Sequence, residues 1–216
     1  MDFDSRYMFI HRLPSVVPTI FPSLIWSRKV DSSDNQVFFT FDDGPCPEIT
    51  NFVLEELDKY QAKATFFSIG KNLLAHADLG HLIQSSGHSL GNHTMNHVNA
   101  WQVSYQAYKE DKVACDVVFD ELGISSVGFR PPYGRVNREL IRDLASQESV
   151  FMWSVLTGDY HSGLSSKSII NQCIKAIKPG SIIVFHDSQK AFPHLKIVLP
   201  ALLSYCHGQG FQLLPL

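Results

Sequence analysis

Short runs rich in β-branched and aromatic residues alternate with longer amphipathic runs along this chain. The alternation is typical of parallel α/β folds, because a parallel strand needs a crossover connection, usually a helix, before its neighbour can pair with it. A β-sandwich or a helical bundle would show only one of the two patterns. Seven strands are predicted, at residues 37–41, 64–69, near 89–90, 128–129, 150–153, 182–185 and 211–214. Seven such strands suggest an α/β barrel.

Helices are predicted between these strands from hydrophobic periodicity and from start signals such as Pro47. Their expected ranges are 47–60, 71–86, 104–122, 137–146, 165–177 and 195–206. A length of 216 residues with 44% hydrophobic content suffices for one domain with a sizeable core. We therefore expect a single domain covering residues 1–216.

Residues 1–35 are expected to form an N-terminal segment that packs on the barrel. Its apolar stretch from Leu13 to Trp26 is interrupted by Pro14, Pro18 and Pro22, and no basic region precedes an uninterrupted apolar run. Neither a signal peptide nor a membrane span is therefore predicted, which favours a cytoplasmic protein without a firm membrane partner. A contact with a membrane surface is the open alternative. The side chains expected to pack on the domain are Ile20, Phe21, Leu24, Ile25 and Trp26.

Charge and cysteine content narrow the function further. The net charge of -3, the pI near 6.3 and the scattered Lys and Arg residues give no basic patch, so nucleic acid is not an expected partner. Cys46, Cys115, Cys173 and Cys206 form no C-x-x-C pair, and no disulfide framework is implied. Cys46 lies three positions after Asp43, but zinc thiolate ligands usually come in spaced pairs, so a role in loop packing is expected.

Unusual polar residues cluster directly after the predicted strands. In α/β barrels the C-terminal ends of the strands are where sites are assembled, so residues far apart in sequence can share one cavity. The residues in such positions are Asp42, Asp43, His93, His97, Arg130, Asp159, His186 and Asp187.

Three of these side chains suit a divalent metal. His93 and His97 are four residues apart, and a helical turn would place both imidazoles on one face. Asp43 would complete a set of two histidines and one carboxylate, which suits hydrolytic zinc and also non-haem iron. The adjacent second acid, Asp42, and the strand-end His186 favour a hydrolase over a non-haem iron oxygenase.

The segment R-P-P-Y-G offers a free backbone donor and a cation. Its two prolines fix an extended backbone and lack amide donors, which leaves the amide of Tyr133 able to point at a ligand. Arg130 could pair with Asp42 and keep it ionised, although an ordinary structural ion pair is an equal alternative. His186, beside Asp187, is either a general acid or a hydrogen-bonded core histidine.

These motifs together resemble the polysaccharide deacetylases, also called NodB-like domains or carbohydrate esterase family 4. The motifs T-F-D-D-G-P, H-T-x-x-H, R-P-P-Y-G, the tract 153–160 and I-V-F-H-D occur in the family's order, and the likeness runs from about Val37 to the C-terminus. The resemblance implies a distorted (β/α)7-type barrel. It also implies that Asp42 is the general base and that Asp43, His93 and His97 hold a divalent metal, with zinc expected.

The same resemblance assigns three further roles. Arg130 would orient the base, the amide of Tyr133 would help to hold the oxyanion, and His186 would be the general acid. Family members usually remove acetyl groups from polymers that contain N-acetylglucosamine, and some remove O-acetyl groups from xylan.

The fourth motif departs from the family pattern. Leu156 stands where many members have an Asp placed to tune the acid histidine. Without a carboxylate the pKa of His186 is expected to be lower, unless Asp159 or Asp187 substitutes.

The aromatic residues of this motif have two interpretations. Trp153 and Tyr160 either wall an acetyl pocket and stack on a sugar, or they are core aromatics.

The sequence thus predicts a metal-dependent hydrolase that removes acetyl groups from N-acetylglucosamine-type sugars in an oligo- or polysaccharide, its expected partner. O-acetyl polysaccharide esterase activity is the first alternative. A weakly active homologue that binds metal and glycan is the second; Leu156 favours it modestly, whereas the complete acid, base and ligand set argues against it.

Overall fold

Seven strands form the sheet of this protein, whose computed structural model describes residues 11–14, 16–31, 34–144 and 147–216. The strand order is β4-β3-β2-β1-β6-β5, and β7 pairs with the start of β1. All these pairings are parallel, which confirms the prediction of a parallel α/β fold. The strands are β1 Gln36–Asp42, β2 Ala64–Ser68, β3 Ser89–Asn92, β4 Ser126–Phe129, β5 Val155–Leu156, β6 Ile182–His186 and β7 Gln212–Leu213.

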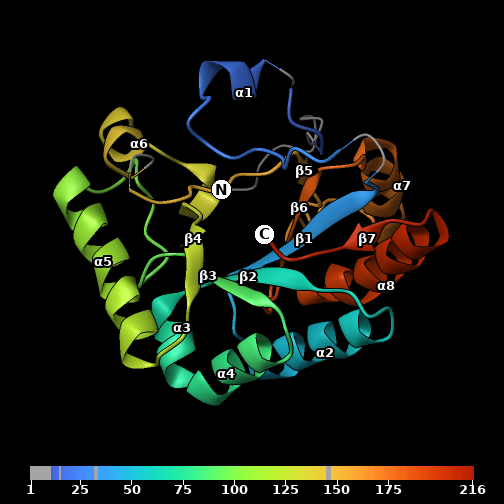
Figure 1. Cartoon of the computed structure of the whole chain (residues 1–216), viewed down its shortest axis with the longest axis horizontal. Helices are drawn as coiled ribbons and strands as arrows, with labels where there is room; N and C mark the ends of the chain where they lie inside the picture. The colour runs from blue at the N-terminus through green and yellow to red at the C-terminus, as the bar shows by residue number, and fades with distance from the viewer. Residues whose placement is uncertain (1–10, 15, 32–33, 145–146) are drawn as a thin grey trace.

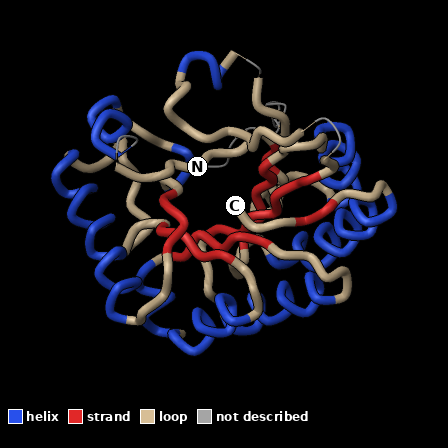
Figure 2. The backbone as a smooth tube through the Cα atoms, in the orientation of Figure 1, coloured by secondary structure: helices blue, strands red, loops and turns tan. Residues whose placement is uncertain are grey.

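Helices surround the strands on the outside of the barrel (Figures 1 and 2). Two of them begin at a serine cap: Ser104 accepts a hydrogen bond from the amide of Ala107, and Ser165 accepts one from that of Ser168. The helices are α1 Val17–Ile20, α2 Pro47–Asp58, α3 Gly70–Ala75, α4 Ala77–Ser85, α5 Tyr105–Glu121, α6 Arg138–Leu144, α7 Ser166–Ala176 and α8 Phe192–Gly208, with a 3₁₀ turn η1 at Pro132–Gly134.

The alternation of side chains along β1 separates two environments. Phe39 and Phe41 pack in the large core between the sheet and helices such as α2 and α8, where Phe41 stacks on Phe185 at 5.3 Å. Successive strand residues point to opposite faces, so Phe38, Thr40 and Asp42 face the barrel interior instead. Because both faces are covered, β1 is apolar along most of its length, and its interior-facing polar residues need partners inside the barrel.

The barrel is closed between β4 and β5 by irregular backbone rather than by a regular strand. The predicted strand at 150–153 is reduced to isolated bridges, from Val150 to Phe129 and from Phe151 to Ile25, and regular pairing starts only at Val155. The carbonyl of Met152 accepts a hydrogen bond from the buried Arg130 side chain at 2.9 Å, and its amide donates to the carbonyl of Ile25 at 2.8 Å. The prediction of a strand at 150–153 is therefore wrong in extent.

The N-terminal segment crosses the open side of the barrel, at the top of Figure 1. Leu24 and Trp26 are buried there, in contact with apolar residues around β4 and α6. Ile20 and Phe21 are 60% and 38% exposed, so their expected packing is wrong. Ile20 ends the short helix α1, which has no buried residue, and Phe21 follows it directly. Residues 1–10 of the predicted segment lie outside the described residues.

One predicted helix is also divided in the structure. The single helix expected at 71–86 is divided into α3 and α4 at His76, whose φ of -134° and ψ of 50° are not helical. The helix expected at 137–146 is observed as α6, Arg138–Leu144, and residues 145–146 lie outside the described residues.

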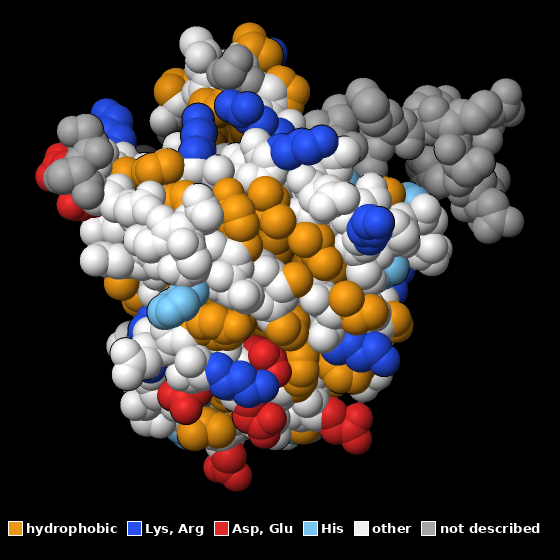
Figure 3. All heavy atoms as spheres, turned by 90° about the vertical axis from the view of Figure 1, so that its right-hand side faces the viewer, with side chains coloured by type: hydrophobic (Ala, Val, Ile, Leu, Met, Phe, Trp, Pro, Cys, Tyr) orange, Lys and Arg blue, Asp and Glu red, His pale blue; other side chains and the backbone are white. Residues whose placement is uncertain are grey.

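On the side of the barrel where α7 and α8 lie, hydrophobic side chains form a broken band between charged ones (Figure 3). Charged side chains of both signs occur on this face. Within the described residues, none of the helices combines the length and apolar character required to cross a bilayer. All four cysteines are free thiols, with Cys46 half-buried and the other three buried.

Candidate active site

The C-terminal ends of the strands bring the predicted site residues together. Asp42 and His186 are register partners at the ends of β1 and β6, His93 directly follows β3, and Arg130 directly follows β4. They surround a cavity of about 520 Å³, except that Arg130 lies beneath it. The cavity is lined by Asp42, Asp43, His93, His97, Tyr133, Gly134, Arg135, Trp153, Leu156, Tyr160, Val184, His186, Ser188 and Lys190.

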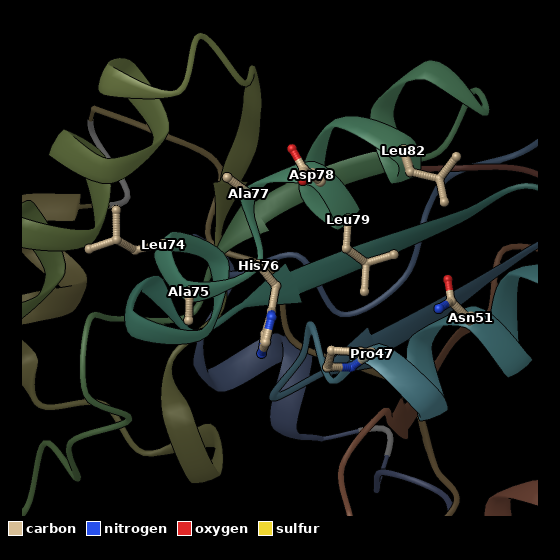
Figure 4. Close-up of a pocket in the computed structure, with 9 residues that line it drawn as sticks. All are labelled: Pro47, Asn51, Leu74, Ala75, His76, Ala77, Asp78, Leu79 and Leu82. Atoms are coloured by element: carbon tan, nitrogen blue, oxygen red, sulfur yellow. The ribbon is translucent and has the colours of Figure 1, made fainter.

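A second cavity of about 500 Å³ lies between α2 and the α3–α4 segment (Figure 4). Of the described residues that line it, only His76 and Asp78 are titratable, and both come from the same short segment. Among the described residues, the one group of three side chains suited to a metal lies instead at the strand ends. The strand-end cavity is therefore the candidate active site.

Asp43, His93 and His97 converge on one point of this cavity, with ligand atoms all within 4.8 Å of one another. Asp43 Oδ1 is 3.2 Å from His97 Nε2 and 3.8 Å from His93 Nε2. Nδ1 of His93 lies 2.7 Å from the carbonyl oxygen of Arg130, an acceptor, so Nδ1 carries the proton and the lone pair of Nε2 is free for a ligand. A carboxylate oxygen and two imidazole nitrogens fit a divalent metal such as zinc.

The protonation state of the two histidines suits this role. Burial lowers the pKa of His93, against the raising effect of Asp42 and Asp43. Burial, together with the neighbouring His93, lowers the pKa of His97 to about 4. Both imidazoles are therefore neutral near pH 7, which is the form that binds a metal ion.

The segment between the two histidines is a loop, and the expected helical turn is wrong. Thr94 and His97 have φ values of 64° and 57°, which no α-helix allows. Asn92 Oδ1 accepts the amide of Thr94 at 2.7 Å, and the amide of Gly70 donates to the carbonyl of Thr94 at 2.9 Å. These contacts hold the loop so that the imidazole of His97 lies 5.1 Å from that of His93, measured between ring centroids.

Asp42 is held by a fully buried arginine. Nη1 of Arg130 donates to Asp42 Oδ1 at 2.8 Å and to Thr40 Oγ1 at 2.7 Å, and the guanidinium lies 4.1 Å from the centroid of Phe67. Burial is the largest influence on the pKa of Asp42 and raises it, but the charges of Arg130, His93 and His186 and the hydrogen bond from Arg130 together lower this pKa below its usual value. The carboxylate is thus ionised and fixed in place. The contribution of Thr40 was not predicted, although its spacing of two from Asp42 puts both on the same face of β1.

We predict that Arg130→Met destabilises the protein by about 3–5 kcal/mol, because it leaves the buried charge of Asp42 without its partner. The free energy of unfolding, measured by urea denaturation, checks this. The matched control is Arg142→Met, since the Arg142 side chain is 77% exposed and should change stability by no more than about 0.5 kcal/mol. An equal effect of the two substitutions would contradict the importance of the buried pair.

His186 is paired with the carboxylate of Asp159. His186 Nδ1 lies 2.8 Å from Asp159 Oδ1, and the His186 amide donates to Asp159 Oδ2 at 2.9 Å. Burial alone would lower the pKa of His186, but the charge and hydrogen bond of fully buried Asp159 raise it to about 9. The reduction expected without a carboxylate partner does not occur, because Asp159 substitutes.

Asp187 does not take part in this pair. Its carboxylate accepts the amide of Gly44 at 3.0 Å and the hydroxyl of Thr50 at 2.5 Å. A Cβ atom at position 44 would lie 2.0 Å from Asp187 Oδ2, which explains the glycine of the T-F-D-D-G-P motif. Asp187 therefore shapes the loop that carries Asp43.

The R-P-P-Y-G turn places a backbone donor at the cavity. Tyr133 has a φ of 60°, and its amide has no hydrogen-bond acceptor among the described residues, whereas the amides of Gly134 and Arg135 close the turn. Gly134 has a φ of 61°, and a Cβ atom there would lie 2.3 Å from the ring of Trp153. The motif thus requires glycine both for its backbone conformation and for its contact with Trp153.

The two aromatic residues of the fourth motif both reach the cavity. Trp153 lines it from beneath Gly134, and Tyr160 packs its ring edge-on against His186 with 4.9 Å between centroids. Leu156 also lines the cavity and adds an apolar wall. Sequence reasoning did not single out Arg135, Val184, Ser188 or Lys190, which complete the lining.

Comparisons with known proteins show the family of this chain. The family model described as polysaccharide deacetylase matches residues 29–150, and the chain belongs to this family. It is 32% identical to a peptidoglycan-N-acetylglucosamine deacetylase of Bacillus cereus over 83% of this chain and 67% of that protein. It is 29% identical to a chitooligosaccharide deacetylase of Azorhizobium caulinodans over 88% of this chain and 97% of that protein.

Solved structures show the same architecture. The crystal structure of the Bc1960 peptidoglycan N-acetylglucosamine deacetylase superposes with a TM-score of 0.81 at 28% sequence identity. The match covers 88% of this chain and 89% of that one. A distorted (β/α)7 barrel is therefore the fold of this chain as well as the expectation from its sequence.

Proposed function

We propose that this protein is a metal-dependent hydrolase that removes the acetyl group from N-acetylglucosamine-type sugars in an oligo- or polysaccharide. The main support for the proposal is that Asp42 and His186 line the same cavity and have pKa values shifted in opposite directions. The pKa of Asp42 is lowered and that of His186 is raised to about 9, so near pH 7 one is a base and the other an acid. The activities named for the relatives support a glycan as substrate.

Asp43, His93 and His97 are the residues that would hold the metal, and we propose zinc. A divalent ion bound there would polarise the acetyl carbonyl and favour deprotonation of water. Since Arg130 occupies Asp42 Oδ1, Asp42 Oδ2 is the oxygen we assign to accept a proton from the attacking water.

The Tyr133 amide and His186 act on the oxyanion and on the departing nitrogen, which form after water attacks. The amide of Tyr133 donates a hydrogen bond to the oxyanion that forms when the carbonyl is attacked. His186 donates its Nε2 proton to the departing nitrogen, while Asp159 holds Nδ1. An amide needs this proton because a free amide anion is a very poor leaving group, whereas a sugar alkoxide leaves more easily.

An assay of acetate release tests the proposal. It compares N-acetylglucosamine oligomers with an aryl acetate ester, each incubated with the zinc-loaded and with the metal-free protein. We expect zinc-dependent release from the oligomers, and His186→Ala should reduce that rate by about 10²–10⁴-fold while reducing ester cleavage less. Release from the ester alone would support an O-acetyl esterase instead. No release from either substrate would leave a protein that only binds metal and glycan.

The pairing of His186 with Asp159 predicts a change in the pH profile. His186 must be protonated to act, so the rate of amide cleavage should fall on the alkaline side as pH passes about 9. Asp159→Asn removes the main raising influence and leaves burial to lower the pKa, with only the charges of Asp43 and Asp42 opposing it. The alkaline limb of kcat/KM should therefore move to lower pH by about 1–3 units.

Asp187→Asn is the matched control for this experiment, because Asp187 contacts Gly44 and Thr50 rather than the acid. Its alkaline limb should stay in place. An unchanged limb in Asp159→Asn would show that His186 is not the titrating group.

A further inference from the structure

Trp101 is an unusually exposed aromatic residue near the active site, with 66% of its surface accessible. Exposing so large an apolar side chain has a free-energy cost, and the cavity does not include it. It lies in the turn that follows the metal-binding loop and plays no part in the chemistry proposed above. Its environment therefore needs a separate explanation.

The indole is held in a fixed orientation. Its Nε1 donates to the carbonyl of Val136 at 3.0 Å, and its backbone amide donates to Oδ1 of the buried Asn99 at 3.0 Å. The guanidinium of Arg135 lies 4.7 Å from the ring centroid. Because the polar N–H is already satisfied and the ring is immobilised, the surface left for a ligand is an apolar aromatic face presented at little entropic cost.

This ring is continuous with the active site. The same Arg135 guanidinium lies 5.7 Å from the ring centroid of Tyr133, and Tyr133 in turn packs against His97 with 4.6 Å between centroids. Tyr133 is 59% exposed, and it lines the catalytic cavity together with Arg135. We call the row formed by Tyr133, Arg135 and Trp101 the aromatic ledge.

We propose that the aromatic ledge binds sugar residues of the same glycan chain beyond the one whose acetyl group lies in the cavity. This inference rests on the proposed function, and it makes the substrate an oligomer or polymer rather than a single sugar. A pyranose ring has an apolar C–H face that stacks on an aromatic ring, while its hydroxyl groups remain at the edges for hydrogen bonds. Arg135 forms no ion pair with a described carboxylate, so its N–H groups can donate to those hydroxyls.

Trp101→Ala tests the ledge, with hydrolysis measured on the N-acetylglucosamine hexamer and dimer by the zinc-loaded protein. We expect kcat/KM for the hexamer to fall about 10-fold, mostly through KM, and the fall for the dimer to be smaller, because only the longer chain extends past Arg135. Trp101→Tyr, which keeps an aromatic face, should retain most of the activity on the hexamer. Ile197→Ala is the control, since Ile197 is 50% exposed on α8 and lies outside the ledge.

A measurement of binding affinity tests the role of the ledge independently of catalysis. In the Asp42→Asn background, calorimetric titration with the hexamer should show about 10-fold weaker binding when Trp101→Ala is added. Three results would contradict the proposed role of the ledge. Trp101→Ala could reduce kcat/KM equally for hexamer and dimer, it could leave the hexamer affinity unchanged, or the hexamer could fail to bind at all. If the wild type releases no acetate but Trp101→Ala still weakens binding, the proposed function fails while the ledge stands.

Discussion

Asp42→Asn is expected to reduce deacetylation by about 10²–10⁴-fold without removing the metal. The amide cannot accept a proton from water, yet it can still accept the hydrogen bond that Arg130 donates to position 42. Asp42 is not part of the three-residue group whose ligand atoms converge, so metal content should be unchanged. Turnover of the hexamer and zinc content by mass spectrometry are the two measurements.

Stability has to be followed in the same variant. Asp42→Asn leaves the fully buried charge of Arg130 without a counter-charge, so the melting temperature should fall and assays belong well below it. Asp120→Asn, at an exposed position of α5, is the control for the chemical change alone. Near-normal turnover would show that Asp42 is not the base, and loss of zinc would make it a ligand instead.

His93→Ala is expected to weaken zinc binding by more than about 100-fold, since losing even an outer partner of a ligand costs 10–100-fold. Turnover should be lost in parallel, as it should when a chelator strips the wild type. Competition with a chromophoric chelator measures the affinity. His81→Ala, at an exposed position of α4, should bind zinc normally.

The His93 variant also separates ligand loss from unfolding. His93 is buried, so its removal leaves a cavity, and circular dichroism must show that the barrel persists. If a folded His93→Ala protein keeps full zinc occupancy, His93 is not a ligand.

The parts of this structure that sequence could predict are those set by local periodicity. The alternation along β1 puts Asp42 inside the barrel, and the rule that parallel strands end at a common edge brings it to His186. Both inferences need only the identity of a strand, and neither depends on loop geometry.

The parts that sequence could not predict depend on distant contacts. The spacing of His93 and His97 suggests a helical turn, but two hydrogen bonds of Thr94 stabilise a loop with positive φ angles instead. The amide of Thr94 donates to the Asn92 side chain, and its carbonyl accepts from the amide of Gly70. Asp159 becomes the partner of His186 because it follows β5, which pairs with β6. No local pattern contains that information.

The central position of β1 has a consequence for synthesis on the ribosome. Its first neighbour, β2, is made within about 25 residues, but β6, which covers its other edge, begins only at residue 182. At about 5–20 residues per second, the nascent chain carries an unpaired apolar strand edge for roughly 7 to 28 seconds. Asp43, His93 and His97, the residues proposed to hold the metal, emerge long before His186, the proposed acid. A nascent chain would therefore complete the proposed metal site first, while it is still exposed to aggregation along β1.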